Sequence, residues 1–203
     1  MSYIHVITPA QAEGKLSDLY RRVAGPGGQV DNVLQVHSLR PHTLEGHMAL
    51  YKSVLHHPRN QLPLWFMEAV GVLVSLLNDC RYCAQHHAAG MRRLLGNGSD
   101  FAGGDFEKLR SQLESDEPGE PFTEAQRAAL RYARKLTLEP GAILQRDIDE
   151  LRAAGLDDGC ILEVNQVVAY FCYANRTVSG LGVDTAGEVL GLTPQDAGAA
   201  DDA

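Results

Sequence analysis

Helix start signals and stop signals recur along the whole chain, and they restrict its fold more than any other feature. A capping oxygen or a proline precedes most of the apolar stretches, and glycine or proline usually follows them. Inside these stretches apolar residues recur every three or four positions, and no segment shows the sustained alternation of a strand. The sequence therefore predicts an all-α fold. The start signals are Thr8-Pro9, Pro41, Pro63, Asn78-Asp79, the capping box of Thr123 with Gln126, and Asp157-Asp158.

These signals place the expected helices. They run from Pro9 through Val23 and over about 41–55, 64–77, 80–95, 128–138, 143–154 and 161–181, with a short helix around 106–113 in a polar connection. We expect the two long apolar helices, 65–77 and 161–171, to pack together as the core of an antiparallel bundle. Glu68 and Glu163 each lie twelve residues before a matching position, Cys80 and Asn175, so these helices align as a possible repeat.

The composition indicates one folded domain. Of 203 residues, 44% are hydrophobic and 22% are charged, as in a globular protein rather than a disordered one. We expect a single helical domain over 1–185, with possible related halves at 30–98 and 122–185. A frayed tail is expected over 186–203, because its end is rich in Ala, Asp and Gly.

The charge balance and the N-terminus bear on partners and location. A formal net charge of -8 disfavours nucleic acid and anionic membranes as partners. No apolar run approaches the roughly 18 residues of a membrane span, and the first residues lack the basic and apolar regions of a secretory signal. We therefore expect a cytoplasmic protein, in which a close cysteine pair is typical of redox or metal chemistry rather than of a structural bridge.

Residues 68–87 carry the candidate chemistry. Cys80 and Cys83 form a Cys-x-x-Cys pair at a capped helix start, where backbone N–H groups and the helix dipole favour a thiolate. His87 follows Cys83 by four residues, so it lies one turn along the same helical face. Glu68, on the preceding apolar helix, needs a partner if it is buried, and an imidazole from the next helix would suit it. Together these residues predict a carboxylate–histidine–thiol relay.

Other interpretations of the same residues stay open. One is a non-enzymatic thiol–disulfide adaptor or sensor, which needs the same thiols as an enzyme. Another is a zinc site of Cys80, Cys83 and His87, for which no fourth ligand has suitable spacing. His42 and His47 are weaker candidates for the mouth of the site. No Gly-rich phosphate loop follows a strand, so we expect no haem, flavin or nicotinamide cofactor.

The spacing Glu-x11-Cys-x2-Cys-x3-His resembles that of the alkylhydroperoxidase D-like, or carboxymuconolactone decarboxylase-like, superfamily. The flanking segments Ser38-Leu39-Arg40-Pro41, Leu151-Arg152-Ala153-Ala154-Gly155 and Asn175-Arg176 are similar to its peroxidase-related branch, so the resemblance covers about residues 10–185. It implies an antioxidant enzyme, a thiol-dependent peroxidase of organic hydroperoxides, with a homo-oligomeric state. It also implies no bound cofactor and an external dithiol reductant, either lipoyl-type or thioredoxin-like.

The resemblance assigns roles residue by residue. Cys83 matches the peroxidatic cysteine, which attacks the O–O bond and becomes a sulfenic acid. Cys80 matches the resolving cysteine, which condenses with that sulfenic acid to a disulfide. His87 matches the relay histidine that helps to deprotonate Cys83, and Glu68 matches the acid that orients this histidine.

The sequence departs from the alkylhydroperoxidase D motif at Tyr82, where that motif has a further relay histidine. A phenol is a much weaker base than an imidazole. Tyr82 is therefore a candidate to hold a water or a peroxide oxygen rather than to shuttle protons. His86 is an extra imidazole nearby, but it should point about 100° away from His87 around the helix.

Overall fold

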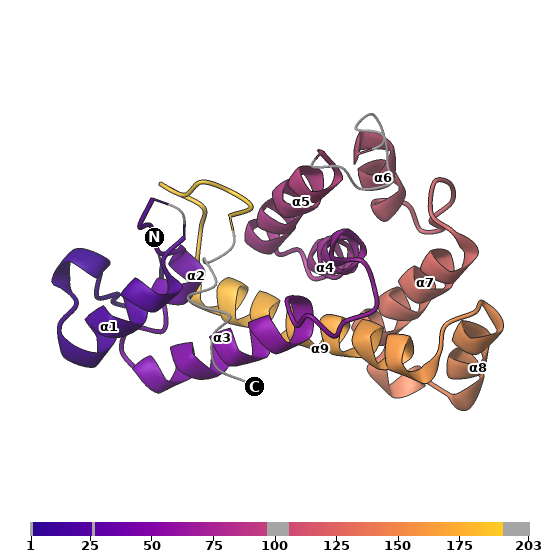
Figure 1. Ribbon diagram of the computed structural model, residues 1–203, viewed down its shortest axis with the longest axis horizontal. Coiled ribbons are helices and arrows are strands. Elements are labelled where there is room, and N and C mark those ends of the chain that lie inside the picture. Colours follow the sequence, from indigo (N-terminus) through magenta and orange to yellow (C-terminus); the bar gives the residue numbers. More distant parts are fainter. Residues whose placement is uncertain (1, 26, 97–105, 193–203) are drawn as a thin grey trace.

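The computed structural model describes residues 2–25, 27–96 and 106–192, and every regular element in these ranges is helical (Figure 1). This confirms the all-α fold class. The elements are η1 (Pro9–Gln11), α1 (Gly14–Val23), α2 (Asn32–Gln35), α3 (Pro41–Leu55), α4 (Leu64–Leu77), α5 (Arg81–Gly96), α6 (Phe106–Leu113), α7 (Glu124–Leu138), η2 (Pro140–Ala142), α8 (Gln145–Ala153) and α9 (Asp158–Leu181). In the part of the chain that is described, every helix is too short or too polar to cross a bilayer.

Helix α4 forms the centre of the molecule. All of its residues from Trp65 to Ser75 are buried, because the sequence is apolar on every side of the helix. Figure 1 shows α4 nearly end-on, with the other long helices arranged around it. It packs against α5, α7 and α9, so the expected contact between the two long apolar helices is confirmed.

The crossing of α4 and α9 requires a glycine. A Cβ at Gly71 would lie 2.2 Å from Cζ of Phe171, which is far inside contact distance. Phe171 is fully buried, and its ring meets the ring of His87 edge-on, with centroids 4.5 Å apart. The close approach of α4 and α9 therefore also sets the position of a side chain on α5.

A second, smaller core joins α1, α2 and α3, where Leu19, Leu34 and Leu44 pack together. The single helix expected from Pro9 through Val23 is wrong at its start. The chain forms only the three-residue η1 after Thr8, and the left-handed φ of Gly14, +52°, separates this turn from α1. The four-residue helix α2 was not expected at all, because it is too short to show a helical period.

Residues 183–192, which we call the C-terminal strap, fold back onto the protein after α9. The side-chain amide of Asn32 donates to the carbonyl oxygens of Asp184 and Ala186, at 2.9 and 3.2 Å. Further along, Gly191 lies against the backbone of α5, and a Cβ there would be 2.6 Å from the Gly90 nitrogen. The strap therefore ties α2 to α5.

The expectation of a frayed tail from residue 186 is wrong for residues 186–192, because hydrogen bonds and close packing hold them. The rest of that tail, 193–203, lies outside the described residues. The division of the domain into halves at 30–98 and 122–185 stays a prediction.

Candidate active site

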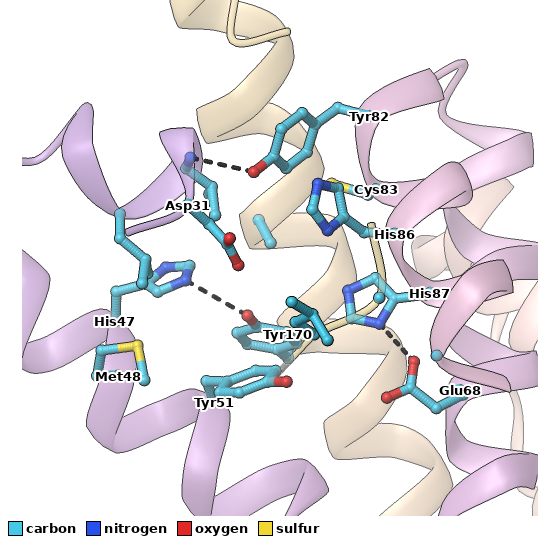
Figure 2. A pocket seen from close by; sticks show the side chains of 16 residues that line it. Asp31, His47, Met48, Tyr51, Glu68, Tyr82, Cys83, His86, His87 and Tyr170 are labelled. Carbon is cyan, nitrogen blue, oxygen red and sulfur yellow. Dashed lines mark hydrogen bonds and ion pairs between the residues drawn. The ribbon is translucent and has the colours of Figure 1, made fainter. Parts of the chain in front are cut away.

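A cavity of about 70 Å³ lies between α2, α3, α5 and α9, and the strap forms part of its wall (Figure 2). One water occupies roughly 10–15 Å³ of such space, so the cavity suits about five waters or a ligand of a few heavy atoms. Its wall brings together titratable side chains that are far apart in the sequence. They are Asp31, His47, Tyr51, Glu68, Tyr82, Cys83, His86, His87 and Tyr170.

Glu68 and His87 form a direct pair in this cavity. Nδ1 of His87 donates to Oε2 of Glu68 at 2.5 Å, and only 4% of the Glu68 side chain is exposed. A carboxylate on Nδ1 fixes the orientation of the ring and favours proton acceptance at Nε2. The expected imidazole partner for Glu68 is therefore present, and it comes from the next helix as the spacing indicated.

The two thiols lie at the start of α5. Asp79, at a left-handed φ of +52°, closes the turn after α4, and Cys80 directly precedes the first residue of α5. Cys80 and Cys83 are both free and both buried. The turn between two packed helices thus places both thiols in the interior.

The pair shares its protons unequally. The pKa of Cys80 is lowered to about 6, first because the Cys83 thiol donates to it, and also because the Cys83 backbone N–H, Ser179 and Asn175 donate. The pKa of Cys83 is raised, first because its S–H is held by Cys80 and then by burial. The thiolate expected at the helix start therefore resides on Cys80, with Cys83 as its hydrogen-bond donor.

The two sulfur-bearing residues face different spaces. Cys83 lines the cavity, whereas Cys80 lines a separate groove of about 460 Å³ bordered by α4, α5 and α6. Asn175 of α9 lies between α4 and the thiols. Its amide nitrogen donates to Ser75 Oγ at 3.1 Å, and its oxygen accepts from the Asn78 amide at 3.0 Å. This fixed amide lowers the pKa of both cysteines.

Tyr82 lies at the cavity, as expected of a candidate substrate-site residue, but its hydroxyl already has partners. It donates to Glu188 Oε1 at 3.0 Å and accepts from the Val33 backbone N–H at 3.2 Å. Burial and the Glu188 carboxylate raise its pKa, so it stays a phenol. Its hydroxyl proton is thus committed to Glu188, and holding a peroxide oxygen stays a prediction for the remaining lone pair.

His86 also lines the cavity, although its angle from His87 had placed it elsewhere. Nε2 of His86 donates to Oε2 of Glu188 at 3.0 Å, with 8% and 6% of the two side chains exposed. Sequence reasoning missed Glu188 because it comes from the strap, 102 residues after its partner. The only signal in the sequence was an unexplained second histidine beside His87.

Two further titratable residues come from α3 and from the residue before α2. Burial is the main cause that raises the pKa of Asp31 to about 6. The Glu188 carboxylate also raises this pKa, whereas His86 and His87 lower it. Burial, aided by His37, lowers the pKa of His47 to about 4, so this ring is neutral. His47 was a weak candidate in the sequence and does reach the cavity, 3.4 Å from the Tyr170 hydroxyl, whereas His42 is exposed.

Within residues 2–25, 27–96 and 106–192, no three His, Cys, Asp or Glu side chains are grouped in a way that could hold a metal ion. The zinc interpretation of Cys80, Cys83 and His87 therefore finds no support in the geometry. The arrangement instead suits thiol chemistry next to fixed proton donors and acceptors.

Comparison with models of known protein families gives no match, and comparison with curated proteins gives none either. Solved structures do match. A peroxidase-related protein from Silicibacter sp. TM1040 is 28% identical, with 78% of each chain covered and a TM-score of 0.67. An alkylhydroperoxidase AhpD core, peroxidase-related protein from Ralstonia eutropha JMP134 is 22% identical, with 90% of this chain and 91% of the other covered and a TM-score of 0.73.

These matches agree with the all-helical fold. The chain has the fold of the alkylhydroperoxidase D-like, peroxidase-related proteins. The fold also extends to an enzyme of other chemistry, since this chain is 17% identical to the debrominase Bmp8 in complex with 2,3,4-tribromopyrrole. That match covers 92% of this chain and 95% of the other, with a TM-score of 0.65.

Proposed function

We propose that this alkylhydroperoxidase D-like protein is a thiol-dependent peroxidase of small hydroperoxides. The observation that carries the proposal is the cavity in which Cys83 meets the hydrogen-bonded pair of His87 and Glu68, with Cys80 beside it. The size of the cavity favours a small substrate. The resemblance of the motif supports the same reaction class.

The proposed reaction begins when Cys83 gives its proton to His87 and attacks the terminal oxygen of the hydroperoxide ROOH. An S–O bond forms, the O–O bond breaks, and the expelled oxygen takes a proton and leaves as the alcohol ROH. The Cys80 thiolate then attacks the Cys83 sulfenic acid, which forms the disulfide. The sulfenic hydroxyl leaves as water with the proton that His87 holds. A thiolate that is already ionised near neutral pH suits Cys80 for this second step.

The cycle closes when an external dithiol reduces the disulfide. We propose a reductant of the lipoyl or thioredoxin-like class that attacks the Cys80 sulfur, because Cys80 lines the groove outside the cavity. The dithiol becomes a disulfide, and both cysteines return to their reduced state.

The first experiment treats the reduced protein with one equivalent of ethyl hydroperoxide and maps the products by peptide mass spectrometry. We expect a Cys80–Cys83 linkage with the loss of two hydrogen atoms, reversed by dihydrolipoamide. Cys83→Ser should abolish turnover, and Cys80→Ser should stop at a sulfenic acid that dimedone traps. Cys160→Ser is the matched control, since Cys160 bonds to Asp157 and Gln61, does not line the cavity and should leave turnover unchanged.

Peroxide consumption that persists in Cys83→Ser would overturn the assignment of Cys83. Thiols that stay reduced with peroxide but exchange rapidly with one partner protein would favour the adaptor interpretation. Release of bromide from 2,3,4-tribromopyrrole without peroxide turnover would replace the peroxidase with a reductive dehalogenase.

A further inference from the structure

We propose that His86, oriented by Glu188 of the strap, donates the proton that the leaving oxygen takes up when the O–O bond breaks. The inference rests on the proposed peroxidase function. It adds a catalytic acid, His86, and a positioning residue, Glu188, to the residues that the motif contains.

Two imidazoles from α5 line the cavity, and each is paired with a carboxylate; Glu68 lines the cavity too, whereas Glu188 contacts His86 from outside the lining. Glu68 with His87 forms the first, and Glu188 with His86 forms the second, at 2.5 and 3.0 Å. Figure 2 shows the two imidazoles on the same side of the cavity, with Cys83 behind His86. The second pair is as buried as the first, so water competes little with either.

Both imidazoles are neighbours of Cys83 on α5. His86 and His87 follow it by three and four residues, the two spacings that place side chains on adjacent rows of a helix one turn along. The angle of about 100° between them therefore does not remove His86 from the site. The two imidazoles lie one helical turn after Cys83, one on either side of the Cys83 position around the helix axis.

Several hydrogen bonds fix the side chain of Glu188 in the strap. Its Oε2 faces His86, while its Oε1 accepts from the Tyr82 hydroxyl at 3.0 Å and from the Asn32 backbone N–H. The ring of Tyr82 also lies against that of His86, with centroids 4.5 Å apart. These contacts fix the position of the carboxylate, and the carboxylate in turn fixes the orientation of the His86 ring.

The chemistry needs two proton groups in opposite states. Cys83 needs a base that accepts its proton, and the expelled alkoxide is a strong base that needs an acid. In the proposed cycle His87 keeps the Cys83 proton until the sulfenic hydroxyl leaves as water, so the alkoxide needs a separate acid. Tyr82 does not supply it, because its hydroxyl proton is donated to Glu188. His87 as the base and His86 as the acid supply both states in one cavity.

The test compares two substrates of similar size with different leaving groups. Ethyl hydroperoxide expels an alkoxide, which needs a proton, whereas peracetic acid expels a carboxylate, which does not. We expect His86→Gln to slow Cys83 oxidation by ethyl hydroperoxide about a hundredfold, which is the lower end of general acid catalysis. The rate of Cys83 oxidation by peracetic acid should change by less than about threefold. Glu188→Gln should show the same selective loss with a smaller factor.

Asn32→Ala is the matched control. It removes the side-chain bonds that anchor the strap at residues 184 and 186 but keeps the backbone N–H that reaches Glu188. Whatever it does to the rates, it should leave the ratio of the two substrates unchanged. A His86→Gln variant that loses equal factors on both substrates would overturn the role of His86 as the acid.

A second measurement uses the wild-type protein alone, so it does not depend on the folding of any variant. Wild-type protein should show a larger solvent deuterium isotope effect with ethyl hydroperoxide than with peracetic acid, because only the first needs a proton on its leaving oxygen, and equal effects would also overturn the proposal. A wild-type Cys83 that does not react with ethyl hydroperoxide at all would instead overturn the peroxidase function.

Discussion

At the scale of single residues, the sulfur with the lower pKa is not the one that faces the cavity. Cys80 holds the thiolate because Cys83, a backbone N–H and two side chains donate to it, whereas Cys83 keeps its proton while it lines the cavity. This division suits a resolving thiol that is ionised before it is needed. It also leaves the activation of Cys83 to a base in the cavity.

The thiolate can be titrated directly. In the reduced protein we expect thiolate absorbance, or alkylation of Cys80, to rise with a midpoint near pH 6. Cys83→Ala should raise this midpoint, because it removes the donor that contributes most. An unchanged midpoint would assign the stabilisation of the anion to the helix start and Asn175 instead.

The same shift links stability to pH. The folded-state pKa of Cys80, about 6, lies below the ordinary value of 9.0, so the thiolate stabilises the reduced fold at alkaline pH. This contribution is lost as the pH falls through about 6. Denaturant unfolding of reduced wild type and Cys80→Ser should therefore differ most at alkaline pH, and a constant difference at all pH values would contradict the shift.

The pair of Glu68 and His87 gives a second test at the residue scale. Glu68→Gln keeps the size of the side chain but removes the charge that orients and polarises His87, so Cys83 oxidation by ethyl hydroperoxide should fall about a hundredfold. Glu163→Gln is the control, because that carboxylate only accepts from the backbone N–H groups of residues 61 and 62. Equal rates for both variants would mean that the charge of Glu68 does not contribute to the activation of Cys83 through His87.

The sequence allowed the first pair to be predicted, because its spacing places both residues on consecutive packed helices. It did not allow the second pair to be predicted. His86 was judged by its angle from His87 and not by its distance from Cys83, and Glu188 lies in a segment without any periodicity. Local patterns identify the residues of adjacent helices, but not a partner that a loop returns from a distant part of the chain.

At the scale of elements, the crossing of α4 and α9 connects packing to the site. Gly71 lets the two helices approach, and Phe171 at the crossing touches the ring of His87. A change at this crossing should therefore affect both stability and the relay.

Gly71→Ala places a methyl group where the Phe171 ring lies. We expect it to lower the free energy of unfolding by about 1–3 kcal/mol and to slow the peroxide reaction through His87. Gly46→Ala in α3 is the control, because nothing lies within 4 Å of its Cβ position, and alanine there should raise stability by up to about 1 kcal/mol. Chemical denaturation of both variants checks the sign.

The helix ends were the most predictable part of the fold. Helices α3 and α4 start and end where proline and the turn residues place them, because these signals act within a few residues. The break between η1 and α1 and the short α2 depend instead on how the N-terminal segment packs against α3 and the strap. That packing leaves no local pattern in the sequence.

At the scale of the whole molecule, the cavity is built from both ends of the chain. Residues near the N-terminal α2, the helices in the middle and the strap all contribute to its wall. The strap closes against α5 at Gly191, whose contact with Gly90 leaves no room for a side chain.

This closure should determine which hydroperoxides enter. We expect wild-type protein to favour ethyl hydroperoxide over the bulkier cumene hydroperoxide. Gly191→Ala should reduce this preference, because a Cβ 2.6 Å from the Gly90 nitrogen pushes the strap away from α5. Gly187→Ala is the control, since it also has a positive φ, +82°, but nothing within 4 Å. A preference that changes equally in both variants would reflect backbone strain in the strap and not closure.

The position of Glu188 has a consequence for biosynthesis. Its imidazole partner emerges from the ribosome 102 residues earlier, and α5 can form with its two thiols long before the strap has been translated. During that interval the nascent chain carries cysteines without the wall that later encloses Cys83. For the peroxidase proposed above, this means that the unfinished chain has to be kept reduced, because its exposed thiols would meet the hydroperoxide before the wall of the cavity is complete.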